Sequence, residues 1–266
     1  MGGLIMPAGY AHFDFGQQVY NKLDLELQER LKKHMNLYNI GVHGPDILFY
    51  HQALKKNIVK DLGFSMHKKQ AYDFFKDAKH IINHSLYKED AFAYICGFIT
   101  HYVLDSECHG YIGNQEKILN MTHSEIESEF DRELLVQQGQ DPLRTSLTSH
   151  IHPSLEVSQV IAPFFKVTDK EIWKSLKDLL FYLNMIKAPG RFKRGFVLLA
   201  MKVAGIYPNY KGLIINYVKN ETSRECIDEL IRKKNQAVSL AVSLIQDYSI
   251  HLHDDYLNER FGQTYE

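Results

Sequence analysis

Three polar residues recur at intervals of four in one stretch of the chain: His101, Asp105 and His109. An α-helix turns about 100° per residue, so each step of four advances only about 40° and the three side chains share one face. The opposite face is apolar, which predicts a core helix over residues 88–106: Phe92, Ile95, Phe98, Ile99, Tyr102 and Val103. Two imidazoles and a carboxylate on such a helix are donors that zinc prefers. A buried hydrogen-bond network or a pair of surface histidines is the alternative.

Apolar residues recur at helical spacing along most of the chain, and no strand pattern is longer than a few residues. The sequence therefore predicts an all-α fold with one domain over residues 7–260, preceded by a non-native or disordered lead over residues 1–6. Further helices are expected over residues 17–38, 65–84, 154–166, 169–187 and 221–249. Glycines indicate a loop over residues 110–114.

Composition excludes several classes of protein. A net charge of −1 gives no reason to expect binding to nucleic acid or to an acidic membrane surface. The chain has no run of about 18 consecutive apolar residues, so no membrane span is expected. Three cysteines far from any CxxC pattern and an N-terminus without a signal-peptide pattern favour a cytoplasmic location with reduced thiols. Histidine is the outlier, with 14 copies.

Further candidate ligands lie in three other segments. His12 ends the first loop, and Asp46 lies in a Gly-Pro-Asp turn that can aim it inward, with His51 five residues later. His123 and Glu127 are four residues apart in a helix that Thr122 can cap. The alternatives are a loop histidine, an acid that favours a helix N-terminus, and a chance spacing in a charge-rich segment.

Other polar clusters are interpreted as structural. His67, His80 and His84 have no carboxylate at ligand spacing, so solvated or packing roles are expected for them. A loop role is favoured for His150 and His152 over metal binding. The basic group Arg191, Lys193 and Arg194 is typical of a solvated face.

Taken together, these segments resemble the bacterial zinc-dependent phospholipase C family, an all-helical fold shared with the P1-type nucleases. The likeness covers residues 7–131 and rests on the order and type of eight residues: His12, Asp46, His51, His101, Asp105, His109, His123 and Glu127.

The resemblance implies a zinc cluster. One zinc would be held by Asp46, His51, His101 and Asp105. A second would share Asp105 and take His12, and a third would take His109, His123 and Glu127. In secreted members an N-terminal tryptophan completes the second ion, whereas Trp173 is the only tryptophan here. Two or three zinc ions are therefore expected.

The same resemblance implies a hydrolase, with Asp46 as general base for water attack on a phosphodiester or a phospholipid head group. The alternatives are a P1-like single-strand nuclease, or a non-catalytic metal-binding protein that retains the site. The lack of a basic, aromatic-laced groove disfavours the nuclease, so no nucleic-acid partner is expected.

Overall fold

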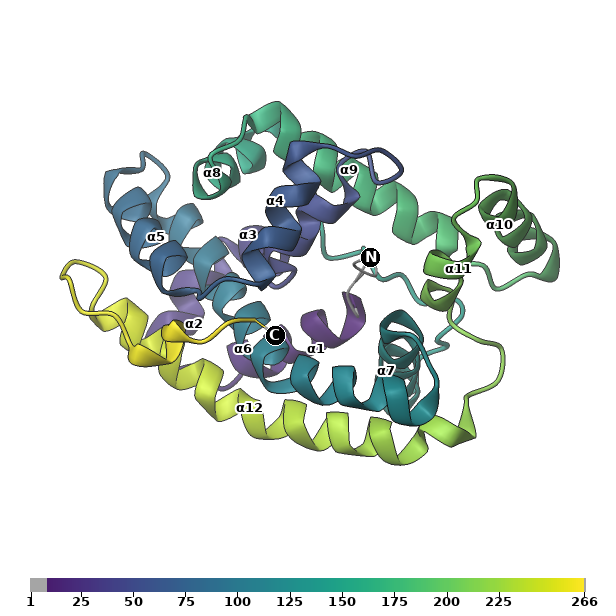
Figure 1. The fold of residues 1–266 in the computed structure, drawn as a ribbon. Coiled ribbons are helices and arrows are strands. Elements are labelled where there is room, and N and C mark those ends of the chain that lie inside the picture. The colour runs from purple at the N-terminus through teal and green to yellow at the C-terminus, as the bar shows by residue number, and fades with distance from the viewer. Residues whose placement is uncertain (1–8, 266) are drawn as a thin grey trace.

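Residues 9–265 of the computed structural model are described here, and within them the chain forms helices and loops without a β-strand (Figure 1). The expectations for residues 1–6, and for the first two residues of the predicted domain, lie outside the described part. The α-helices are α1 (Gly9–Tyr20), α2 (Leu25–Lys32), α3 (Met35–Gly41), α4 (Ile58–His67), α5 (Tyr72–His84), α6 (Lys88–Leu119), α7 (His123–Gln137), α8 (Leu155–Phe165), α9 (Asp169–Ile186), α10 (Arg191–Val203), α11 (Tyr207–Tyr210) and α12 (Arg224–Ile250). Short 3-10 helices are η1 (Gly44–Tyr50), η2 (Lys211–Leu213), η3 (Glu221–Ser223) and η4 (Glu259–Gly262).

The all-α prediction is confirmed, but three boundaries are wrong. The segment 17–38 contains the end of α1, the whole of α2 and the start of α3, and the segment 65–84 is divided between α4 and α5. The loop expected over residues 110–114 is helical, since α6 continues to Leu119 and ends at Asn120 in the left-handed conformation (φ 51°). Glycine lowers helix propensity by only about 1 kcal/mol, and the burial of Ile112 in this segment favours continuation of the helix.

Helix α6 is the centre of the fold. It is 32 residues long, and α1, α3, α5, α7 and α12 all pack against it. Figure 1 shows α12 running beneath it along the lower edge of the view, with α8 and α9 at the upper edge. Residues Ala91–Asp105 of α6 are all buried. No helix within residues 9–265 is long and apolar enough to cross a membrane.

Two glycines allow α3 and α6 to cross with their backbones in contact. A Cβ atom on Gly97 would lie 2.1 Å from the carbonyl oxygen of Tyr38, and one on Gly41 would lie 2.1 Å from that of Tyr94. Real Cβ atoms do not approach backbone this closely, so neither position tolerates a side chain without separation of the helices.

The variant Gly97→Ala should therefore destabilise the protein by about 3 kcal/mol, because the added methyl group must push α3 away from α6. Gly110→Ala is the matched control on the same helix, since its Cβ would meet nothing within 4 Å. It should stabilise α6 by about 0.5–1 kcal/mol. Urea unfolding of both variants measures the difference, and equal midpoints would contradict the close crossing.

Candidate metal centre

Helix α6 presents His101, Asp105 and His109 on one buried face. The Nε2 atom of His101 lies 3.0 Å from Oδ2 of Asp105, and Nε2 of His109 lies 3.2 Å from Oδ1 of the same carboxylate. All three side chains are at most 7% exposed. Each oxygen of Asp105 therefore faces a different imidazole.

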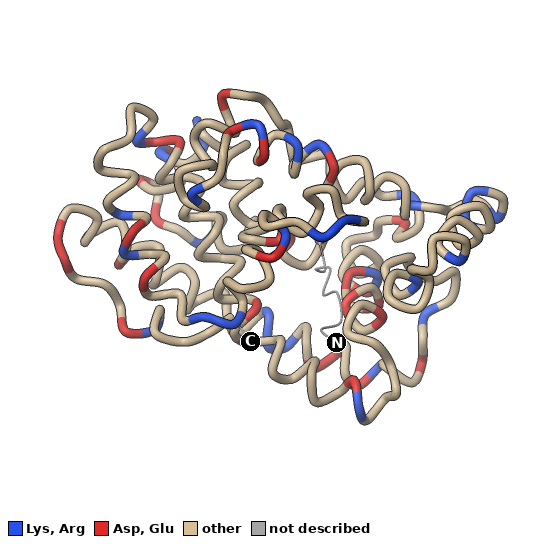
Figure 2. The backbone as a smooth tube through the Cα atoms, turned by 45° about the horizontal axis from the view of Figure 1, so that its top comes forward, with Lys and Arg blue, Asp and Glu red and all other residues tan. Residues whose placement is uncertain are grey.

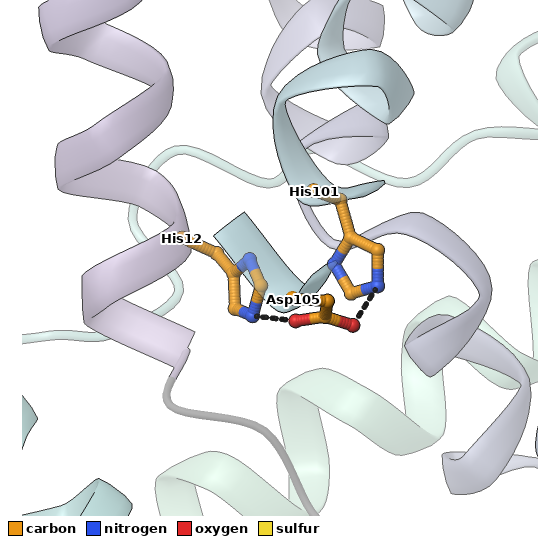
Figure 3. Close-up of side chains that lie close together, drawn as sticks. All are labelled: His12, His101 and Asp105. Atoms are coloured by element: carbon orange, nitrogen blue, oxygen red, sulfur yellow. Dashed lines mark ion pairs between the residues drawn. The ribbon is translucent and has the colours of Figure 1, made fainter. Parts of the chain in front are cut away.

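The third imidazole near Asp105 is His12, which lies in helix α1 rather than in the loop expected there. Its Nε2 atom is 3.2 Å from Oδ1 of Asp105, and its ring stacks on that of His101 (Figure 3). The buried Asp131 of α7 accepts hydrogen bonds from the backbone N–H groups of Tyr10 and Ala11. A carboxylate at a helix N-terminus stabilises it, which explains why α1 begins before His12.

Asp46, in η1, meets a histidine that the sequence interpretation had set aside. The Nε2 atom of His67, at the end of α4, lies 3.0 Å from Oδ1 of Asp46 and 3.5 Å from Oδ2 of Asp105. On the other side, Nδ1 of His101 lies 3.8 Å from Oδ2 of Asp46. The expectation that His67 is solvated or only packs is wrong: it is 2% exposed and faces two carboxylates.

His51, which was expected beside Asp46, lies outside this group. Its Nδ1 atom is 3.2 Å from the hydroxyl oxygen of Ser175 in α9. Because η1 is a 3-10 helix that ends at Tyr50, His51 does not follow Asp46 on a helical face. Helix α4 instead packs back against η1 and carries His67 to Asp46.

Gly44 allows η1 to reach His101. Its φ is +50°, and a Cβ atom there would lie 2.2 Å from Cδ2 of the His101 ring. Glycine adopts this left-handed conformation without steric cost and leaves room for the imidazole. The Gly-Pro-Asp turn thus places Asp46 against α6.

The third part of the site comes from the start of α7. Thr122 is the N-cap of this helix, as predicted, and it forms a capping box with Glu125. His123 is therefore the first residue of the helix. The Nε2 atom of His123 lies 3.3 Å from Oε1 of Glu127, which is also 3.8 Å from Nε2 of His109. The other nitrogen of His123 lies 3.5 Å from Glu116, an acid on α6 that was not among the candidates.

These contacts have the dimensions of metal ligation. Two ligands each about 2.1 Å from a tetrahedral zinc lie about 3.4 Å apart. The nitrogen–oxygen distances across the site run from 3.0 to 3.8 Å. Three groups of candidate ligands result: His12, His101 and Asp105; Asp46, His67 and His101; His109, His123 and Glu127.

The unpaired polar atoms also fit a cation. Among the described residues, eleven buried side-chain nitrogen and oxygen atoms have no hydrogen-bond partner, and nine of them belong to these eight residues. Nδ1 of His67 lies 2.9 Å from the carbonyl oxygen of Gly63, so it must donate its proton there. The neutral ring then turns the lone pair of Nε2 toward Asp46, an arrangement that a cation between them stabilises.

The electrostatics of the site demand positive charge. Burial opposes ionisation of Asp105, but the imidazoles of His101, His109 and His12 outweigh it and hold its pKa well below the usual value. With no cation present, burial lowers the pKa of His67, yet the neighbouring carboxylates of Asp105 and Asp46 raise it well above normal. For His123, Glu127 and Glu116 likewise overcome burial and raise the pKa to about 10. Three buried carboxylates thus attract protons when no dication is bound.

Comparison with known proteins gives one result. A model of the family described as zinc dependent phospholipase C matches residues 11–178, more than half of the chain and the whole of the site described above. Searches of curated proteins and of solved structures found no match. The donor set, with its buried imidazoles and carboxylates, suits zinc. The chain belongs to the zinc-dependent phospholipase C family.

Proposed function

We propose that this protein is a zinc-dependent phosphodiesterase that hydrolyses phospholipids at the bond between glycerol and phosphate. Water attacks phosphorus, the bond to the glycerol oxygen breaks, and the products are a diacylglycerol and a phosphorylated head group. One observation carries the proposal: the two oxygens of Asp105 face imidazoles from α1, α4 and α6 at 3.0–3.5 Å. A carboxylate shared in this way is suited to join neighbouring metal sites.

The candidate ligands form two sets that would each hold one zinc ion, and a smaller group of donors for a third. Asp46, His67, His101 and Asp105 would hold one zinc, and His109, His123 and Glu127 would hold another. His12, with the other oxygen of Asp105, supplies donors for a third, so we propose two or three ions. Zinc bound there would supply Lewis acidity, which lowers the pKa of water and draws charge from phosphoryl oxygens.

Asp46 is proposed as the general base. Its carboxylate is 2% exposed, and Oδ1 faces Nε2 of His67 at 3.0 Å, where zinc would be held, which leaves Oδ2 to take the proton of the attacking water. A cavity of about 20 Å³ lies at the other set of ligands, beside Glu127 rather than Asp46, and is lined also by Tyr50, Ser124 and Asp131. A space of this size holds one water molecule. The leaving oxygen takes its proton from solvent.

Hydrolysis of p-nitrophenylphosphorylcholine tests this function, with a single-stranded oligonucleotide as the competing substrate. We expect release of p-nitrophenol, its loss on treatment with a chelator and its return on addition of zinc. Cleavage of the oligonucleotide alone would contradict the proposal in favour of a P1-like nuclease. Bound zinc without turnover of either substrate would contradict it in favour of a metal-binding protein.

A further inference from the structure

Helix α10 turns an apolar face outward. Phe192, Phe196, Leu199 and Val203 are 97%, 73%, 60% and 83% exposed. Their spacing of four, three and four places them within one narrow stripe, which we call the α10 face. The opposite side of the helix is also apolar and is buried through Val197 and Met201. A surface helix ordinarily turns polar residues toward solvent. The α10 face is instead an apolar surface that no other described part of the chain covers.

Basic residues flank this face. Helix α10 contains Arg191, Lys193, Arg194 and Lys202 and no acidic residue, as the blue and tan segments at the right of Figure 2 show. At 100° per residue, Lys193 lies on one side of the α10 face, and Arg191 and Lys202 lie on the other. The net charge of −1 for the whole chain conceals this local excess.

The apolar surface continues from α10 into the molecule. A cavity of about 370 Å³ between α9, α10 and α11 is lined by Phe181, Phe196 and Tyr210 among other apolar side chains. Ile186 and Leu213 line both this cavity and the small one beside Glu127. The α10 face therefore adjoins an apolar cavity that Ile186 and Leu213 separate from the small cavity beside Glu127.

We infer that the α10 face docks the protein on the surface of an anionic phospholipid bilayer, with the helix lying in the plane of the interface. This inference rests on the proposed function, since a phospholipid-cleaving site needs contact with its substrate surface. A stripe of aromatic and aliphatic side chains with basic flanks is the pattern of interfacial helices. At 13 residues α10 is about 20 Å long, too short to span the hydrocarbon core.

Charge complementarity favours lipid over a second copy of the chain as the occupant. In a two-fold contact each α10 face would meet itself, which would bring two basic flanks together without any acid on either helix. Anionic head groups attract and neutralise the same flanks. The feature also lies beyond residue 178, where the family match ends.

Flotation with lipid vesicles tests the inference. We expect the intact protein to bind vesicles of phosphatidylcholine with phosphatidylserine more tightly than vesicles of phosphatidylcholine alone. The double variant Phe192→Ser/Phe196→Ser should lose about ten-fold or more in partitioning, and Arg191→Glu/Lys202→Glu should lose the preference for phosphatidylserine. Both pairs of side chains lie on the exposed part of the helix, so folding should not change.

Leu86→Ser is the matched control, because Leu86 is 96% exposed on another part of the molecule. It should bind vesicles as the unaltered protein does. Equal binding by the phenylalanine double variant, or no binding of the unaltered protein to either vesicle, would overturn the inference. So would a lipid-free dimer that the double variant abolishes, measured by sedimentation velocity. Turnover of p-nitrophenylphosphorylcholine, a soluble substrate, should be unchanged in these variants, so failure of docking and failure of the proposed catalysis are measured separately.

Discussion

The variant Asp105→Asn should lose phosphodiesterase turnover by a factor on the order of 10³ or more, together with bound zinc. The substitution keeps the shape of the side chain but removes the charge that faces four imidazoles, those of His12, His67, His101 and His109. An amide offers only one oxygen as a ligand, and its NH₂ group repels a cation. Turnover of p-nitrophenylphosphorylcholine and elemental analysis of the same preparation measure both effects.

Glu107→Gln is the control for this prediction. Glu107 lies on the same helix and pairs with Arg260 at 2.7 Å, with a side chain 39% exposed. The partly buried Arg260 also donates hydrogen bonds to Tyr102 and Ser106, which this variant leaves in place, so the variant should keep its zinc and its turnover. If Asp105→Asn behaved like Glu107→Gln, the shared carboxylate would have no role in metal binding.

The second large effect distinguishes two histidines. His67→Ala should remove about one zinc ion per chain, because it deletes the imidazole that faces both Asp46 and Asp105. His51→Ala should keep the full metal content. It should cost about 1–3 kcal/mol of stability, for the hydrogen bond to Ser175 and for the space left by the buried ring.

Elemental analysis and urea unfolding of the two variants test this assignment. The opposite pattern, with zinc lost in His51→Ala and retained in His67→Ala, would restore the ligand set that the resemblance implied. Loss of zinc in neither variant would contradict a ligand role for both residues.

Local patterns predicted much of the fold. The helices expected over 154–166 and 169–187 correspond to α8 and α9, because Ser154 and Thr168 cap them through bonds within one turn. His101, Asp105 and His109 share a face for the same local reason, since a step of four needs only that the segment is helical. Such signals are carried by neighbouring residues and can be read without knowledge of the tertiary structure.

What the sequence did not reveal depends on contacts between distant segments. His67 is 21 positions after Asp46, and only the packing of α4 against η1 brings them together. One signal could have found it: Val59, Gly63 and His67 recur at steps of four along the buried side of α4. The loop expected at His12 has a related origin, since Asp131 fixes the start of α1 from far along the chain.

The α10 face escaped the sequence interpretation for another reason. Helical periodicity reports that apolar residues share a side, but not whether that side faces the core or solvent. In α10 two apolar sides are present, and only the fold shows that Val197 is buried and Phe192 exposed. The basic residues were accordingly interpreted as a solvated face.

The ratio of zinc to protein, measured by elemental analysis on protein purified without a chelator, tests the central claim most directly. Imidazoles and carboxylates from α1, η1, α4, α6 and α7 converge on one buried site, where we propose two or three zinc ions per chain. A ratio in this range is the expected result. Protein that is folded and free of bound metal would contradict the account.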